Sequence, residues 1–102
     1  MILRRSRFAQ LVDDQLDLFE REEAELLASL PELLERYNQT DRDEAEEAFG
    51  DYADAFDVVS ERLEEMRDHY ARSLDEPDAY IRAFNKAVRR RMPQIAHDFE
   101  DA

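Results

Sequence analysis

Several residue types that define common classes of protein are missing or scarce in this chain of 102 residues. The absence of cysteine excludes a disulfide framework, a thiolate metal site and a cysteine nucleophile. A single glycine leaves no glycine-rich loop that could hold a phosphate group. No apolar run approaches the ~18 residues of a membrane-spanning helix, and the basic start lacks the apolar centre of a signal peptide. We therefore expect a cytoplasmic protein that contacts no membrane and carries no cofactor.

The charge of the chain is strongly one-sided. Asp and Glu number 27 against 14 Lys and Arg, which gives a formal net charge of -13 at pH 7. A surface of this sign repels phosphate backbones, so nucleic-acid binding is disfavoured. The hydrophobic content of 43% and the short length suit one modest core, and we expect a single helical domain over residues 1–102.

The clearest periodicity lies in residues 41–74. Apolar side chains recur there at the two core positions of a heptad repeat, which hold Phe49, Phe56, Leu63 and Tyr70 at one and Ala45, Tyr52, Val59 and Met66 at the other. Acidic residues occupy the opposite face, as in an amphipathic helix with one solvated side. The spacing predicts a helix over 41–74, with Thr40 placed to cap its start.

A second long helix is predicted before this one. In residues 7–37, apolar side chains recur at three- and four-residue steps and stay in phase across Pro31. This pattern predicts one helix that bends at the proline, which cannot donate a main-chain hydrogen bond. A second interpretation stays open, because Ser29 and Glu32 also form the pattern of a capping box that would start a new short helix.

A third apolar stripe runs through residues 77–101 and predicts a helix that is capped by Asp75 and bent near Pro93. Long helices with short connections predict an all-α fold, an up-down-up antiparallel three-helix bundle with helices over about 7–37, 41–74 and 77–101. At ~1.5 Å per residue, the third helix is shorter than the hairpin formed by the other two. The far end of that hairpin should therefore extend past the third helix.

The apolar residues at this far end form a candidate protein–protein interface. They are Leu33, Leu34, Tyr37, Ala45 and Phe49. In a monomer they would make an exposed patch of the kind that marks an interface. A symmetric homodimer that joins two hairpin ends would cover the patch. In the alternative, the chain turns at Pro93 so that Ile95 and Phe99 cover the same patch within one molecule.

Polar residues interrupt the apolar stripes of the first and third predicted helices at the same distance along the axis of the bundle. With a rise of ~1.5 Å per residue, Glu22 and Arg91 reach the same level, which predicts that Arg91 pairs with Glu22 or Glu23 at the edge of the bundle. Arg91 belongs to a basic cluster that also contains Arg82, Lys86, Arg89 and Arg90. The cluster either binds an anion or nucleic acid, or it neutralises the acidic helices beside it, which is the simpler role.

Two pairs of carboxylates suggest a different function. Glu44-x-x-Glu47 and Glu65-x-x-Asp68 resemble the acidic pairs with which all-α nucleotide pyrophosphohydrolases of the MazG type hold magnesium against a triphosphate. The resemblance implies a magnesium-dependent nucleotide hydrolase with these four residues as metal ligands. The family places its two pairs on separate facing helices, whereas both pairs here fall on the helix predicted over 41–74.

The sequence thus supports three functional hypotheses. The leading one is a non-catalytic protein–protein interaction module that associates with itself as a homodimer. It leads because a structural role explains each candidate catalytic or ligand-binding motif more simply than a chemical role does. The second is the magnesium-dependent hydrolase that the carboxylate pairs suggest. The third is anion or nucleic-acid binding through the basic cluster of the last helix.

Overall fold

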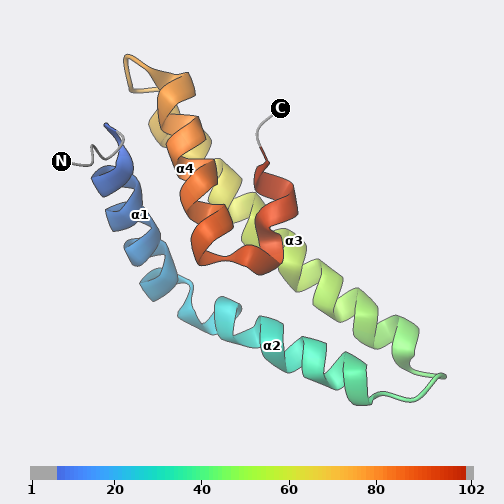
Figure 1. Cartoon of the computed structure of the whole chain (residues 1–102). Coiled ribbons are helices and arrows are strands. Elements are labelled where there is room, and N and C mark those ends of the chain that lie inside the picture. Colours follow the sequence, from blue (N-terminus) through green and yellow to red (C-terminus); the bar gives the residue numbers. More distant parts are fainter. Residues whose placement is uncertain (1–6, 101–102) are drawn as a thin grey trace, which may run out of the picture.

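The computed structural model describes residues 7–100, and this part of the chain is helical, without a strand (Figure 1). Four α-helices are followed by one 3-10 helix: α1 (Ala9–Glu22), α2 (Ala24–Gln39), α3 (Ala45–Ala71), α4 (Pro77–Arg91) and η1 (Pro93–Phe99). The predicted all-helical class is confirmed. The division into three helices is not, because the first and third predicted helices are each divided in two. The predicted end of the third helix at residue 101 lies outside the described residues.

The first predicted helix is interrupted at Glu23, whereas α2 continues through Pro31. Glu23 has φ -108° and ψ 26°, although its N–H still donates to the carbonyl of Phe19 (2.8 Å) and its carbonyl accepts the N–H of Leu27 (2.9 Å). Like charges three residues apart repel each other along this stretch, which contains Glu20, Glu22, Glu23 and Glu25. The helix is therefore weak at this point, and the bend turns α1 toward α4 while α2 runs along α3 (Figure 1).

Capping at the helix ends also differs from the sequence predictions. No helix begins near Ser29, whose hydroxyl donates to the carbonyl of Leu26 (2.5 Å) while α2 continues through Pro31. The hydroxyl of Thr40 donates backward to the carbonyl of Arg36, so it closes α2 instead of capping α3. Serine and threonine hydroxyls can bond to a carbonyl three or four residues earlier, and this contact competes with their role as N-caps.

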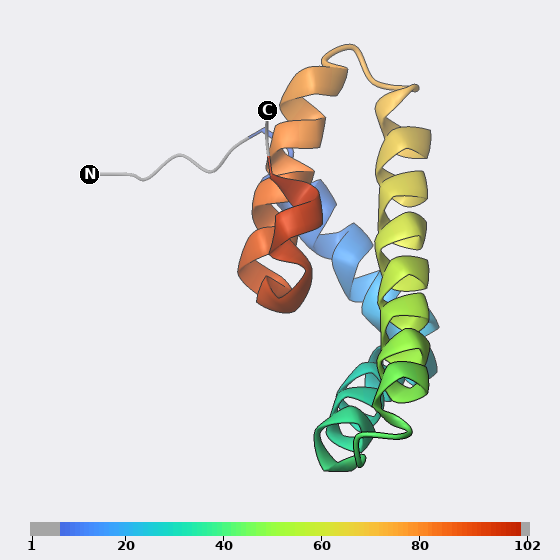
Figure 2. The same ribbon diagram turned by 90° about the vertical axis from the view of Figure 1, so that its right-hand side faces the viewer.

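A hairpin of α2 and the first half of α3 extends beyond the rest of the molecule (Figures 1 and 2). The turn between the two helices is longer than predicted, because α3 begins at Ala45 instead of residue 41. The molecule measures 54 × 32 × 28 Å, and its radius of gyration is 16.1 Å. A compact domain of this length would have a radius of gyration of about 13 Å. The protruding hairpin accounts for the elongated shape.

The core lies where α1, the second half of α3, α4 and η1 meet. Met92 ends α4 with φ -132° and ψ 65°, and Pro93 then begins η1, which folds back against α4 and α3 (Figure 2). Ile95 and Phe99 of η1 are fully buried in the core cluster, and the ring of Phe99 lies 6.4 Å from that of Phe84. The alternative in which Ile95 and Phe99 cover the end of the hairpin is therefore wrong.

Replacing Gly50 by alanine is expected to stabilise the fold by about 0.5–1 kcal/mol. The glycine lies inside α3, and a Cβ at this position would meet no atom within 4 Å. Alanine gains the stability because it loses less conformational entropy on folding than glycine. Thermal unfolding followed by circular dichroism measures the change. A lower midpoint for Gly50→Ala would show that Gly50 contributes through the close approach of another chain.

Candidate interaction surface

Large apolar side chains are exposed at the far end of the hairpin, and we call this surface the hairpin tip: Leu33, Leu34, Tyr37, Ala45 and Phe49. Leu34, Tyr37 and Phe49 are 40%, 36% and 53% exposed, and the other two are partly buried. The rings of Tyr37 and Phe49 lie 5.5 Å apart, so α2 and α3 contribute to one continuous apolar surface. The tip stays uncovered because α4 has only 15 residues against 27 in α3 and ends well before it (Figure 1).

Exposed large apolar side chains are dispersed over the rest of residues 7–100. Leu11 and Leu18 lie about two turns apart on α1, and Tyr70 lies near the end of α3 beside the ring of His69. Single exposed side chains of this kind are normal on protein surfaces, whereas a gathered patch marks a binding site. The hairpin tip is therefore the candidate interaction surface.

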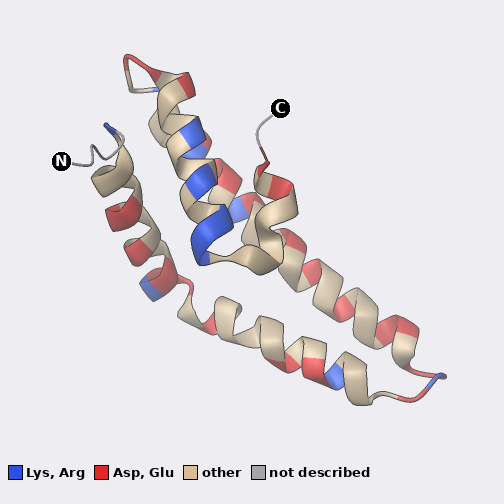
Figure 3. Cartoon of the chain, viewed as in Figure 1, with Lys and Arg blue, Asp and Glu red and all other residues tan. Residues whose placement is uncertain are grey.

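Acidic residues surround the hairpin tip (Figure 3). Residues 41–54 contain seven acids and one arginine. Arg36 of α2 forms an ion pair with Asp51 of α3 (2.7 Å), but an exposed pair of this kind contributes little to stability. The tip is an apolar patch with an acidic rim, and such a surface fits a partner that offers both apolar contact and positive charge.

Arg91 joins α4 to α1, with partners other than the predicted ones. Its guanidinium donates to the carboxylates of Asp17 (2.6 Å) and Glu20 (2.9 Å). It also donates to the main-chain carbonyl of Asp13 (3.1 Å). These contacts hold the end of α4 against the middle of α1, so the basic residue serves the fold.

The predicted partners of Arg91, Glu22 and Glu23, do not reach it. Glu23 pairs with Arg62 of α3, and Glu22 is exposed at the end of α1. The prediction set the starts of the first and third predicted helices at the same height, which placed Glu22 at the level of Arg91. The acidic residues that do reach Arg91 are Asp13, Asp17 and Glu20, two to nine residues before Glu22. Arg91 therefore lies level with the middle of α1 and not with its end.

Two other members of the basic cluster also bond within the chain. Arg90 forms an ion pair with Asp13 (3.2 Å), and Arg89 donates to the main-chain carbonyl of Phe99 (2.6 Å). Neutralisation of the neighbouring acidic helix, the simpler interpretation from the sequence, therefore describes Arg90 and Arg91. Arg89 instead fixes the end of η1 to α4.

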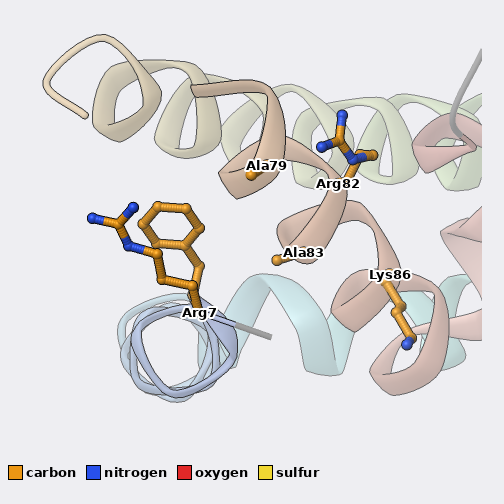
Figure 4. A pocket seen from close by; sticks show the side chains of 6 residues that line it. Arg7, Ala79, Arg82, Ala83 and Lys86 are labelled. Carbon is orange, nitrogen blue, oxygen red and sulfur yellow. The ribbon is translucent and has the colours of Figure 1, made fainter. Parts of the chain in front are cut away.

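Arg82 and Lys86, the remaining members, flank a hollow between the start of α1 and α4 that we call the α1–α4 hollow (Figure 4). It has a volume of about 340 Å³, and its other lining residues are Arg7, Phe8, Ala79 and Ala83. Arg7 pairs with Glu76, whereas Arg82 and Lys86 form no ion pair with any residue from 7 to 100. The sequence prediction missed the hollow, because the hollow depends on how Phe8 is placed against α4.

The four carboxylates of the hydrolase hypothesis are not brought together. Glu44 and Glu47 lie at the start of α3, whereas Glu65 and Asp68 lie near its end. Along the helix, Glu47 and Glu65 are about 27 Å apart at ~1.5 Å per residue. Between residues 7 and 100, no group of three or more His, Cys, Asp or Glu is placed to hold a metal ion. The described chain therefore lacks the facing carboxylate pairs that the resemblance implied.

A buried polar contact joins α1 to α4 in the core. The hydroxyl of Tyr80 donates to Oε1 of Gln15 (2.6 Å), while Nε2 of Gln15 has no hydrogen-bond partner within residues 7–100. Burial raises the pKa of Tyr80 to about 12. Asn85 of α4 accepts a hydrogen bond from Arg67 of α3 (3.1 Å).

The raised pKa of Tyr80 predicts a loss of stability at alkaline pH. The phenol ionises near 10 in the unfolded chain but near 12 in the folded protein, so its stabilising contribution is complete below pH 10 and is lost between pH 10 and about 12. Tyr80→Phe cannot ionise, and its thermal midpoint should fall less steeply over this range. Parallel pH profiles of the two proteins would contradict the prediction.

No helix within residues 7–100 is both long and apolar enough to cross a lipid bilayer. No protein-family model matches the chain, and comparisons with curated proteins and with solved structures return no match. The fold and the surface define an all-helical protein whose hairpin carries an exposed apolar tip. Its function has to be inferred from these features.

Proposed function

We propose that the protein is a non-catalytic interaction module that binds a second copy of itself through the hairpin tip and forms a homodimer. The observation that carries this proposal is the exposure of Leu34, Tyr37 and Phe49 on one apolar surface beyond the core. Side chains of this size stabilise a fold when they are removed from water. At the tip they contribute little to folding and favour non-specific aggregation unless a specific partner covers them.

Self-association suits the architecture of the hairpin. Two paired helices can bury only the faces that they turn toward each other, and helical proteins bury the remaining apolar faces by packing further helices against them. A second copy of the chain supplies those helices. A pair related by two-fold symmetry also leaves neither tip exposed, because each copy uses the same surfaces.

Sedimentation velocity at micromolar concentration tests the proposal. We expect the wild-type protein to sediment as a dimer and Phe49→Glu and Leu34→Glu to sediment as monomers, because each places a charge in the interface. Both positions are exposed in the single chain, so the variants should keep their helical circular dichroism. Leu18→Glu is the matched control, since Leu18 is 42% exposed but lies on α1, and it should remain a dimer.

Three results would contradict self-association through the tip. One is a wild-type protein that remains monomeric at every concentration. Another is a dimer that both tip variants leave intact, which would place the interface on another surface of the molecule. Equal weakening by the Leu18 control and the tip variants would likewise show that added charge, and not the position of the substitution, causes the loss.

A further inference from the structure

We propose that the hairpin tip of one copy docks into the α1–α4 hollow of the other, so that two antiparallel chains each fill the partner's hollow. This inference rests on the proposed self-association and identifies the surface that the tip contacts. It replaces the tip-to-tip contact expected from the sequence. Three features of the molecule carry it: the distribution of charge, the shape of the hollow and the positions of the two surfaces.

Charge opposes a contact between two tips. Each tip brings the seven acids and one arginine of residues 41–54, so joining two tips places like charges against each other. The helix α4 has the reverse balance, with five cations and one acid (Figure 3). Arg82 and Lys86 are the two cations of α4 that flank the hollow, and neither has an ion pair within residues 7–100. They are available to an acidic partner.

The hollow offers an apolar floor between its cations. Phe8, Ala79 and Ala83 line it. Figure 4 shows the two alanines on the side of α4 that faces α1, with Arg82 and Lys86 projecting to either side. Its volume of about 340 Å³ lies within the ~300–1,000 Å³ of pockets that bind small ligands. The hollow can therefore accept an aromatic side chain that carries acidic neighbours.

The hairpin tip presents such a group. Phe49 is the most exposed large apolar side chain within residues 7–100, and Glu46 lies one turn before it on the same side of α3. We place the ring of Phe49 on the apolar floor and the carboxylate of Glu46 beside Arg82 or Lys86.

The two surfaces lie at opposite ends of the molecule. The longest dimension is 54 Å, with the hairpin tip at one end and the starts of α1 and α4 near the other (Figure 1). Two chains that lie side by side in opposite directions bring each tip to the hollow of the other. Both contacts then form at once, and the pair closes with two-fold symmetry instead of growing into a filament.

Complementation between two variants tests the contact. Phe49→Glu has a defective tip and an intact hollow. The double variant Arg82→Glu/Lys86→Glu has an intact tip and a defective hollow. Each variant alone is expected to show an apparent Kd of dimerisation raised by about tenfold or more. An equimolar mixture should form a 1:1 complex more tightly than either variant dimerises alone, because one tip and one hollow remain intact. Sedimentation velocity with one variant fluorescently labelled measures the complex.

The controls separate this inference from the proposed function. Arg21→Glu/Arg72→Glu makes the same change in net charge at two exposed cations outside the hollow and should dimerise like the wild type. A hollow variant that dimerises as tightly as the wild type, while Phe49→Glu is monomeric, would overturn the tip-to-hollow contact and leave self-association standing. A mixture that remains monomeric would also overturn it. A monomeric wild-type protein would overturn both the tip-to-hollow contact and the proposed self-association.

Discussion

Replacing Phe99 by alanine is expected to lower the free energy of unfolding by about 3–5 kcal/mol, the effect of removing a large aromatic side chain from a packed core. Phe99 is fully buried, and its ring lies 6.4 Å from that of Phe84. The guanidinium of Arg67 lies over the same ring at 5.8 Å, and the main-chain carbonyl of Phe99 accepts a hydrogen bond from Arg89 (2.6 Å). The substitution therefore disturbs contacts of α3, α4 and η1 together.

Urea unfolding followed by circular dichroism measures this loss. Small domains are stable by only about 5–15 kcal/mol, so Phe99→Ala should remove a large part of the total. The matched control is His97→Ala, which changes an exposed side chain of the same 3-10 helix and should shift the free energy of unfolding by no more than about 0.5 kcal/mol. Equal unfolding midpoints for the two variants would mean that η1 is not part of the cooperatively folded core.

The burial of η1 also bears on the exposure of the hairpin tip. Ile95 and Phe99 are the large apolar residues that follow Pro93, and both are held in the core against α4 and α3. They cannot cover the tip without leaving that core. The exposed surface of Leu34, Tyr37 and Phe49 is therefore a consequence of how the end of the chain packs.

Parts of the fold with a repeated pattern were predictable from the sequence. The heptad repeat identified α3 to within four residues at each end. Pro93 was predicted to bend the third helix, and α4 ends two residues before it. The bend at Glu23 was missed because apolar spacing continues through it and because Pro31 is the stronger local signal. The direction of η1 was also missed, since it depends on contacts of Ile95 and Phe99 with distant helices.

The candidate surface was predictable where it depends on helix length. Comparing the lengths of the helices identified the hairpin tip, and Leu34, Tyr37 and Phe49 are exposed there. The α1–α4 hollow could not be predicted in the same way, because it needs the relative placement of Phe8 and α4. The partners of Arg91 were misassigned for a related reason, because they depend on how α4 is placed along α1, and Arg91 lies level with the middle of α1 instead of its end.

Replacing Arg91 by alanine is expected to lower the free energy of unfolding by about 2 kcal/mol. The side chain of Arg91 is 20% exposed, and it donates to Asp17 (2.6 Å), to Glu20 (2.9 Å) and to the main-chain carbonyl of Asp13 (3.1 Å). Its removal breaks three of the polar contacts between α4 and α1. It also leaves three acids close together on one side of α1, where like charges three and four residues apart repel each other.

The neighbouring Arg90 provides the control for this prediction. Arg90 lies on the same turn of α4 but is more exposed, and within residues 7–100 it forms an ion pair with Asp13 alone (3.2 Å). Arg90→Ala should therefore lower the free energy of unfolding by no more than ~0.5 kcal/mol. Arg91→Lys should recover only part of the loss, because an ammonium group cannot reproduce the planar fork that reaches two carboxylates and a carbonyl. Thermal unfolding of the three variants measures these differences in stability. Equal midpoints for Arg90→Ala and Arg91→Ala would rule out a special role for Arg91.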